Sequence, residues 1–243
     1  MTLIASHRGG SLEWPENSPM AFRHTAALPV DQVEFDIHPT ADGEIVVIHD
    51  ATLERTTDGS GPVAARTLAE LKALTLRGTA DDRMLTLAEL AALFAPTAIT
   101  LRMEVKPDNA HCPYPGLLPR ALAVLDAAGM RGRTVVTSFQ AETVAEAAAA
   151  PGLAGAIWLV APPVQDDIGV ASIAAVAGAI GVSAVGLRHN RLDEAVIGRL
   201  RASGLAVGAW AVNDEAAICA VLALGVDVFT TDIPTRALAL CGR

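Results

Sequence analysis

Acidic residues spaced two apart are the first chemical signal in this 243-residue sequence. Glu34 and Asp36 lie in one apolar run, and Glu104 and Lys106 repeat the spacing in a later run. Residues two apart on a strand point to the same face of the sheet. Two carboxylates about 4 Å apart repel by roughly 4 kcal/mol at an effective dielectric near 20, so a positive charge must neutralise them. All-oxygen ligands of this kind suit a hard divalent cation, Mg²⁺ or Ca²⁺.

The same acidic residues also have a purely structural explanation. Arg102 and Lys106 lie in the same run as Glu104 and would form a salt-bridge cluster with the carboxylates without any metal ion. The spacing alone does not decide between a metal site and such a cluster.

Two histidines also stand at positions suited to chemistry. His7 follows the first apolar run, and His49 follows a short extended run after the second. Because imidazole titrates near neutrality, the pair could act as general base and general acid. The alternative is that each histidine only hydrogen-bonds to its surroundings. Arg8, beside His7, adds a planar donor that suits phosphate oxygens.

Short apolar runs alternate with Ala- and Leu-rich helical segments along the whole chain. This alternation predicts parallel strands with right-handed crossovers, and eight units predict one α/β domain over residues 1–243, a TIM (β/α)8 barrel. The alternative, an open doubly wound sheet, lacks its Gly-rich G-x-G-x-x-G turn after the first strand. The predicted strands are 3–6, 32–37, 100–105, 134–138, 155–160, 184–187, 206–212 and 227–230, and the helices lie near 18–27, 116–128, 141–149, 170–180, 193–203, 214–224 and 234–240.

Polar residues mark the ends of these elements. Ser18, Asp193, Asn213 and Asp232 precede helical segments and are expected to cap them. Polar residues that follow strands are the candidates for function, because active sites of such barrels lie at the carboxyl ends of the strands.

A small insertion is predicted after the second strand, over about residues 44–95. A turn at 40–43 leads into an extended run at 44–48, and two short helical segments follow at 67–76 and 86–94. We expect this insertion to lie on top of the barrel, with His49 at the end of its extended run.

Composition argues against several classes of protein. The chain has 18 Lys and Arg and 27 Asp and Glu, a net charge of −9, and no basic block, so nucleic acid is not an expected partner. No apolar run reaches the roughly 20 residues of a membrane span, so stable membrane insertion is not expected. The three cysteines form neither a zinc pattern nor a disulfide framework. The N-terminus lacks the features of a signal peptide, and we expect a cytoplasmic protein.

An ordered series of motifs, running from the first strand to the last, closely resembles the glycerophosphodiester phosphodiesterase family. Each motif is weak by itself, but the order and spacing of the set are specific. The motifs are His7-Arg8-Gly9, Pro15-Glu16-Asn17-Ser18, Glu34-x-Asp36, Thr40-x-Asp42-Gly43, Val46-Val47-x-His49-Asp50, Leu53-x-Arg55-Thr56-Thr57-x-Gly59-x-Gly61, Glu104-Val105-Lys106, Ser138-Phe139, Trp210-x-Val212-Asn213 and Asp227-x3-Thr231-Asp232-x-Pro234.

The resemblance implies a TIM barrel with a small insertion after strand two. It also implies metal-dependent hydrolysis of a small glycerophosphodiester to sn-glycerol 3-phosphate and an alcohol, a step of lipid and glycerol metabolism. The residues then have distinct expected roles: Glu34, Asp36 and Glu104 hold one divalent cation, Mg²⁺ or Ca²⁺, His7 is the base and His49 the acid, Arg8 and Lys106 bind the phosphate, and Trp210 walls the site.

Two alternative functions are open at this point. One is a lyase of the same superfamily that cleaves choline-type phospholipids, in the manner of a phospholipase D, and leaves a cyclic phosphate. Such lyases are secreted and carry disulfides, which these cysteines do not suggest. The other is a barrel that binds a phosphate ester without turning it over, although binding alone needs no acid/base pair. The sequence leaves the alcohol, the metal and the oligomeric state open, and we expect headgroup selectivity in loops 107–116, 161–169 and 188–192.

Overall fold

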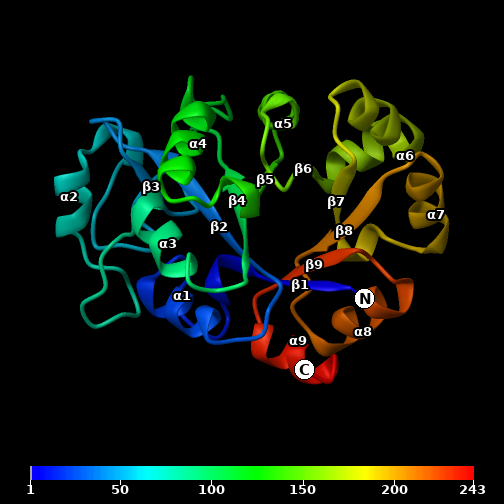
Figure 1. Ribbon diagram of the computed structural model, residues 1–243, viewed down its shortest axis with the longest axis horizontal. Helices are drawn as coiled ribbons and strands as arrows, with labels where there is room; N and C mark the ends of the chain where they lie inside the picture. Colours follow the sequence, from blue (N-terminus) through cyan, green and yellow to red (C-terminus); the bar gives the residue numbers. More distant parts are fainter. Residues whose placement is uncertain (1) are drawn as a thin grey trace.

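A closed parallel barrel forms the body of the protein, as the computed structural model of residues 2–243 shows (Figure 1). The strand order is β1-β9-β8-β7-β6-β5-β4-β2, and the pairing of β1 with β2 closes the ring. The TIM barrel prediction is confirmed, and the open doubly wound sheet is excluded. The strands are β1 (Leu3–Ser6), β2 (Gln32–Pro39), β3 (Ile45–Val47), β4 (Thr100–Val105), β5 (Thr134–Ser138), β6 (Gly155–Val160), β7 (Ala184–Arg188), β8 (Ala206–Trp210) and β9 (Val228–Thr231).

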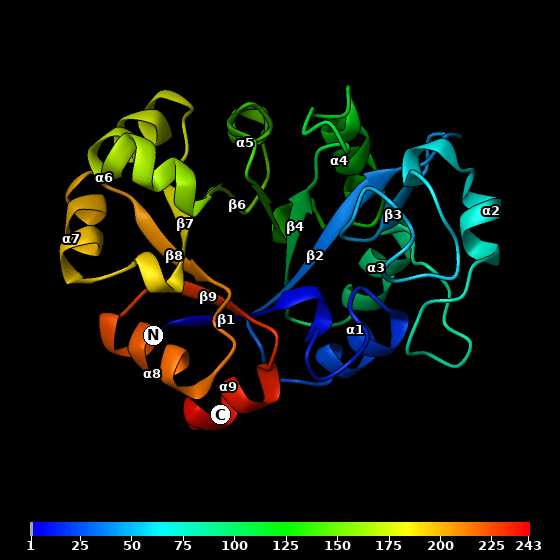
Figure 2. The same ribbon diagram turned by 180° about the vertical axis from the view of Figure 1, so that it is seen from behind.

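Helices surround the barrel, as both views of the ribbon show (Figures 1 and 2). Apart from α2 (Leu68–Ala73), which belongs to the insertion, they cover the outer face of the strands with their apolar sides, which is the arrangement that parallel strands with helical crossovers require. None of the helices in residues 2–243 combines the length and apolar character that crossing a membrane needs. The helices are α1 (Pro19–Ala26), α2 (Leu68–Ala73), α3 (Leu87–Phe94), α4 (Leu117–Ala127), α5 (Ala141–Ala149), α6 (Pro162–Ala179), α7 (Glu194–Ala202), α8 (Glu215–Leu224) and α9 (Pro234–Leu240), with 3-10 turns at His7–Gly9, Val63–Ala65, Arg131–Arg133 and His189–Arg191.

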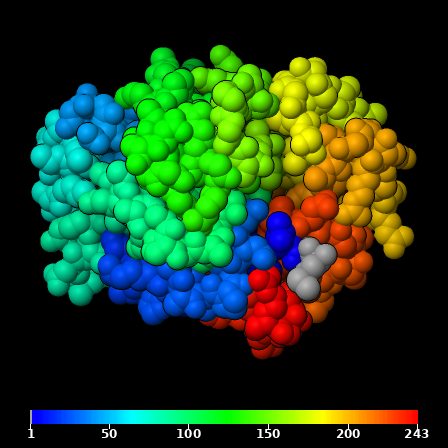
Figure 3. All heavy atoms as spheres, viewed as in Figure 1, coloured from blue at the N-terminus to red at the C-terminus, as the bar shows by residue number. Residues whose placement is uncertain are grey.

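The two ends of the chain meet beside one another on the barrel. Helix α9 packs against β1, so the blue start and the red end of the chain adjoin on the face shown in Figure 3. This contact ties the last element to the first strand and completes the ring of helices.

Strand β3 extends the sheet beyond the barrel. It pairs antiparallel with the end of β2, where Ile37 lies opposite Val47. The insertion has a small apolar core of its own, separate from the barrel core. Helix α3, which falls within the predicted insertion, instead packs on α1 and α4 as a barrel helix. The core of the insertion consists of Val46, Ile48, Leu53, Val63, Leu71, Leu76 and Met84.

Helix α6 differs most from the prediction. It begins at Pro162, whereas the sequence predicted a loop over 161–169 and a helix from 170. A break at Gly169, where φ is +71°, separates the two halves. Proline is favoured in the first turn of a helix, and the two prolines that begin α6 lie there.

Two of the four predicted helix caps are wrong. The side chains of Ser18 and Asp193 cap α1 and α7 by accepting hydrogen bonds from Ala21 and Val196. Helix α8 is capped by Asp214 rather than by Asn213, and α9 begins after Ile233 without a side-chain cap. Asn213 and Asp232 are therefore available for other partners.

Candidate active site at the carboxyl end of the barrel

A cavity of about 340 Å³ opens where the carboxyl ends of the strands meet. Most residues predicted to act in the site line this cavity, although they come from five different strands or the segments that follow them. Asp36 is buried beside it on β2. The predicted residues in its wall are His7, Arg8, Glu34, His49, Glu104, Lys106 and Trp210.

Three carboxylates come together at one side of the cavity. Glu34 and Asp36 project from β2 and Glu104 from the neighbouring β4, and the two strands pair Asp36 with Glu104. One oxygen atom from each side chain lies within 4.8 Å of the other two. Each of the three residues is at most 6% exposed, so the cluster is shielded from water.

Cationic and amide groups surround the carboxylates. Lys106 Nζ lies 2.6 Å from Glu104 Oε1 and 3.3 Å from Asp36 Oδ1. Arg8 Nε lies 3.4 Å from Asp36 Oδ2, which also accepts a hydrogen bond from Asn17 Nδ2 at 2.9 Å. Part of the structural explanation is thus correct, since Lys106 does form a salt bridge with Glu104.

The cations do not satisfy the whole cluster. Among the described residues, Glu34 Oε1 and Asp36 Oδ1 have no hydrogen-bond partner, although both atoms are buried. Burial, and after it the Asp36 carboxylate, raises the pKa of Glu34 to about 7. Burial also opposes ionisation of Asp36, but Lys106, His49 and Arg8 outweigh it and hold the Asp36 pKa well below its usual range.

The backbone after β1 is shaped to place His7 and Arg8. Arg8 has a φ of +51°, which is uncommon for a residue with a side chain, and its backbone N–H donates to Glu34 Oε2 at 3.0 Å. The next residue, Gly9, has a φ of +81°, and a Cβ there would lie 2.8 Å from Ala21 Cβ. Only glycine fits this turn, which lets the chain fold back under helix α1.

His7 is held by an aspartate at the other end of the chain. Its Nδ1 lies 2.5 Å from Asp232 Oδ1, which also accepts a hydrogen bond from Ser11 Oγ. Asn213 donates to the second oxygen of Asp232 and accepts from the Asp232 backbone N–H. Burial opposes protonation of His7, but Glu34 and Asp232 outweigh it and raise the imidazole pKa.

His49 is held by a chain of charged residues. Its Nδ1 lies 2.6 Å from Asp50 Oδ1, and Arg55 Nε donates to Asp50 Oδ2 at 2.7 Å. The same guanidinium contacts both oxygens of Glu16, at 2.5 and 2.9 Å. Glu16 in turn accepts from Arg8 Nη1 at 3.1 Å. The network joins the insertion to the loop after β1 and ends at the acidic cluster.

Both histidines therefore present the same ring atom to the cavity. Hydrogen bonds lower the pKa of both aspartates in spite of burial. For Asp50 the main donor is Arg55, followed by His49, and for Asp232 it is His7. Both carboxyl groups are therefore ionised and only accept hydrogen bonds. Nδ1 of each neutral imidazole must then carry the proton, which leaves Nε2 free to take up or release another. The sequence predicted no role for Glu16, Asp50 or Arg55, although the motifs that contain them belong to the family resemblance.

The other histidines lie outside the inner cavity. His38 Nε2–H donates to the carbonyl of His49, 3.0 Å away, and burial lowers the His38 pKa to about 4, so the ring is neutral. His24 stacks on Trp14 outside the cavity. His111 lines a second groove, of about 690 Å³, and His189 lies in a 3-10 turn after β7.

The second groove adjoins the first cavity at its mouth. Both share His49, Glu104, Lys106, Phe139 and Trp210 as wall residues, whereas His7 lines only the inner cavity. The loop 107–116, in which headgroup selectivity is expected, supplies four residues of the outer groove. Residues 188–192 are absent from both walls.

The acidic cluster fits a divalent cation. Its donors are all carboxylate oxygens, which hard cations prefer, and two of these buried atoms lack a hydrogen-bond partner among the described residues, although Asp36 Oδ1 lies within ion-pair distance of Lys106. A buried, unpaired carboxylate oxygen is costly, and a cation bound between the three side chains would remove that cost.

Comparison with known proteins gives consistent matches. The profile described as "Glycerophosphoryl diester phosphodiesterase family" matches residues 7–236. A glycerophosphodiester phosphodiesterase of Caldanaerobacter subterraneus is 34% identical over 143 residues, which is 57% of this chain and 58% of that protein. A crystal structure from Agrobacterium tumefaciens, described as a candidate glycerophosphoryl diester phosphodiesterase, is 40% identical with a TM-score of 0.96, covering 99% of this chain and 97% of that one. An Oleispira antarctica phosphodiesterase in complex with the product sn-glycerol-3-phosphate shares the fold, at 22% identity and a TM-score of 0.82, over 100% of this chain and 98% of that one.

Proposed function

Since the chain belongs to the glycerophosphoryl diester phosphodiesterase family and is a phosphodiesterase, we propose that it hydrolyses glycerophosphodiesters to sn-glycerol 3-phosphate and an alcohol. The observation that carries this proposal is the position of two carboxylate-held histidines in one cavity with the acidic cluster. Binding of a phosphate ester alone would need neither imidazole.

Glu34, Asp36 and Glu104 are the proposed ligands of one divalent cation, Mg²⁺ or Ca²⁺. When bound, the cation supplies Lewis-acid stabilisation of charge on a phosphate oxygen, a role worth several kcal/mol. Lys106 and Arg8 lie at the rim of the acidic cluster, and both side chains also line the cavity. These two cations are the proposed partners of the remaining phosphoryl oxygens, because charge-assisted donors bind such oxygens strongly.

The two histidines divide the proton transfers in this proposal. His7 is the base, because its Nε2 lies 3.7 Å from Glu34 Oε2, whose negative charge stabilises the protonated ring. It takes a proton from the attacking hydroxyl, either of water or of the substrate's own 2-hydroxyl. His49 is the acid, because it lines both the inner cavity and the outer groove and so stands where the two halves of the diester part. It gives its Nε2 proton to the departing alkoxide.

This division places the two halves of the substrate. The glycerol half would enter the inner cavity beside His7, and the alcohol would leave through the outer groove beside His49. Trp210 lines both spaces, and its ring packs edge-on against Phe139 with centroids 5.7 Å apart. The pair forms an apolar wall along the path of the leaving group.

The cellular setting is part of the proposal. All three cysteines are free thiols, which supports a reducing, cytoplasmic location. The reaction would then recover glycerol phosphate from the diesters that phospholipid breakdown leaves behind.

A panel of glycerophosphodiesters tests the proposal. Choline, ethanolamine, glycerol and inositol esters are incubated with the Mg²⁺- or Ca²⁺-loaded protein, and phosphorus NMR follows the products. The proposal expects sn-glycerol 3-phosphate from at least one ester. A cyclic phosphate that persists would indicate a lyase, and tight binding without any product over hours would indicate a binding protein.

A further inference from the structure

An arginine that the proposed mechanism does not use lies inside the barrel below the acidic cluster. Arg102 stands two residues before Glu104 on β4, so both side chains point into the barrel, and Arg102 lies about 6.6 Å deeper along the strand. It is 3% exposed, yet it lines the inner cavity. A buried arginine at this depth needs an electrostatic reason.

The guanidinium of Arg102 has almost no partner within the protein. Among residues 2–243 it makes one hydrogen bond, from Nη1 to Gln32 Oε1 at 3.3 Å. No carboxylate oxygen of those residues forms an ion pair with it within 4.0 Å, although Glu34 and Glu104 act on it from further away. A guanidinium keeps its charge at neutral pH. An unpaired buried charge is expensive, and most of its five donors are unused.

Two hydroxyl groups line the same cavity. Thr137 Oγ1 on β5 is buried and has no hydrogen-bond partner among the described residues. Thr230 on β9 is 6% exposed and stands two residues before Asp232, again one step deeper in the barrel than the catalytic groups. With Arg102 they form what we call the barrel floor: Arg102, Thr137 and Thr230, three polar side chains on three strands, of which Thr137 pairs with Glu104 and so borders the acidic cluster.

We propose that the barrel floor binds a second anionic group, a carboxylate or a phosphate, carried by the half of the phosphodiester that enters the barrel. The inference rests on the proposed function, because it takes the acidic cluster and the histidines as the place where the phosphodiester is cut. A planar guanidinium with free donors matches an oxyanion, whereas the plain hydroxymethyl end of glycerol would leave its charge unpaired. The protein would then prefer diesters of an acidic glycerol derivative over those of glycerol itself.

One alternative explains Arg102 without a ligand. Its charge could serve only to offset the carboxylates of Glu34 and Glu104, which lie beyond ion-pair distance. That role predicts an effect of Arg102 on every ligand alike. The proposal instead predicts an effect that depends on the charge at the far end of the ligand, and the two are separated by comparing ligands.

Calorimetric titration of the Mg²⁺-loaded protein with matched monoesters tests the proposal. sn-Glycerol 3-phosphate and glycerate 3-phosphate differ only at one end, a hydroxymethyl group against a carboxylate, and glycerol 1,3-bisphosphate places a phosphate there. We expect one of the two ligands that carry a second anionic group to bind about 10- to 100-fold more tightly than sn-glycerol 3-phosphate, the size of a charge-assisted pair of hydrogen bonds. Which one does so identifies the group as carboxylate or phosphate.

Variants at Arg102 locate the effect. Arg102→Met should abolish the preference while leaving the affinity for sn-glycerol 3-phosphate within about threefold, and Arg102→Lys should retain part of it. Arg236→Met, which removes an exposed arginine on α9 paired with Glu215, is the matched control and should change nothing. Thermal unfolding of each variant checks the fold.

Three results would overturn the proposal. They are equal affinity of the wild-type protein for all three monoesters, a preference that survives in Arg102→Met, and a loss in that variant that is the same for every ligand. The comparison in the wild-type protein needs no variant to fold. A protein that hydrolyses neither the diesters in the panel above nor the matching diesters of glycerate 3-phosphate, yet shows the Arg102-dependent preference, would refute the proposed function and leave the barrel floor in place.

Discussion

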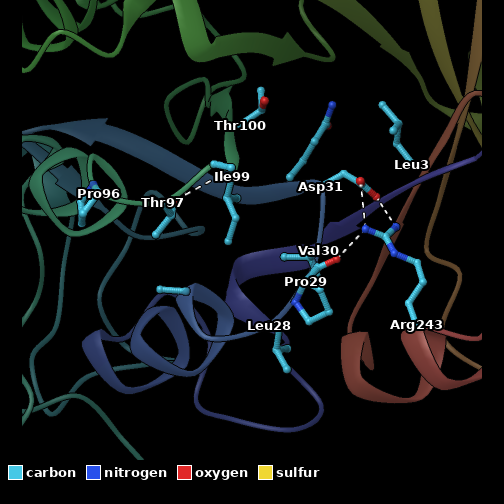
Figure 4. A pocket seen from close by; sticks show the side chains of 13 residues that line it. Leu3, Leu28, Pro29, Val30, Asp31, Pro96, Thr97, Ile99, Thr100 and Arg243 are labelled. Atoms are coloured by element: carbon cyan, nitrogen blue, oxygen red, sulfur yellow. Dashed lines mark hydrogen bonds and ion pairs between the residues drawn. The ribbon is translucent and has the colours of Figure 1, made fainter.

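The two ends of the barrel both carry charged residues and a hollow, but they treat charge in opposite ways. At the amino end, a groove of about 740 Å³ lies among β1, β2 and the start of β4 (Figure 4). Its charged groups are paired with other groups of the protein. Asp31 Oδ2 accepts from the Ile4 backbone N–H at 2.8 Å and from Arg243 Nη1 at 2.7 Å, and Arg243 Nη2 donates to the Pro29 carbonyl.

At the carboxyl end the cavity is half that size, yet its charges are left incomplete. Glu34 Oε1 and Asp36 Oδ1 are buried without a hydrogen-bond partner among the described residues, and Arg102 makes one hydrogen bond and no ion pair there. Because folding rarely leaves such groups unpaired, the deficit points to something that binds there. The comparison teaches that unsatisfied polar atoms, rather than the volume of a hollow, identify the functional end.

The largest expected effect is the loss of a cluster carboxylate. Glu104→Gln should lower turnover of a glycerophosphodiester by about a thousand-fold, since the cation contributes several kcal/mol to the transition state. Asp31→Asn at the amino end is the matched control and should keep wild-type turnover. Metal content by elemental analysis accompanies the rates. Equal losses of turnover in both variants would mean that the two ends of the barrel do not differ in their contribution to catalysis.

Removing either imidazole should be nearly as severe. His7→Ala and His49→Ala should each lose at least about a hundredfold in kcat, the usual size of a proton-transfer contribution, with the fold intact by circular dichroism. His24→Ala, a histidine stacked on Trp14 outside the cavity, serves as the comparison. Near wild-type turnover in either cavity variant would withdraw that histidine from the mechanism.

The network behind His49 should show a smaller and more selective effect. Arg55→Ala should reduce kcat about tenfold for diesters with an alkyl alcohol, because His49 loses the support of Asp50. It should change little for a p-nitrophenyl diester, whose leaving group needs no proton. Arg66→Ala, in the same insertion and paired with Glu70, is the control. An equal loss on both substrates would mean that Arg55 acts on something other than proton donation.

At the amino end, the expected effect is on stability alone. Arg243→Ala should lower the free energy of unfolding by about 1 kcal/mol, because a partly exposed ion pair and a carbonyl contact are lost. Urea denaturation measures this, and the steady-state rate constants should be unchanged. A clear loss of kcat without a loss of stability would show that the amino end takes part in function.

The smallest expected change is spectroscopic. Burial, and after it Asp108, raises the pKa of Tyr114, the only tyrosine, to about 12. The unfolded chain would release this proton near pH 10, so the contribution of Tyr114 to stability is present below pH 10 and is lost as pH rises toward 12. Ultraviolet titration of the folded protein should show the late midpoint. A midpoint near 10 would mean that Tyr114 does not pack against His38, whose ring lies edge-on to it with centroids 5.7 Å apart.

The sequence predicted the barrel, and it placed candidate site residues at strand ends, because both features depend on local patterns. Alternating apolar runs specified the strands, and the i, i+2 spacing placed Glu34 with Asp36 on one face. The residues that hold the histidines could not be predicted in this way. Asp232 lies next to His7 only after the barrel closes, and its position before a helix suggested a cap instead.

The contact between the insertion and the loop after β1 also depends on long-range packing. Arg55 contacts Glu16 only because the insertion folds back over the loop after β1. One signal was available for Asp232, since it directly follows β9 and polar residues at strand ends mark such sites. Nothing in the spacing distinguishes Arg102, which is unpaired, from Lys106, which is paired with Glu104.

The most direct test of the central claim is the activity of metal-depleted protein. The wild-type enzyme is treated with a chelator, its metal content is checked by elemental analysis, and release of sn-glycerol 3-phosphate is measured before and after adding Mg²⁺ or Ca²⁺. The account predicts no detectable hydrolysis without the cation and recovery of the initial rate when about one equivalent is bound. Full activity in protein shown to be free of metal would contradict it.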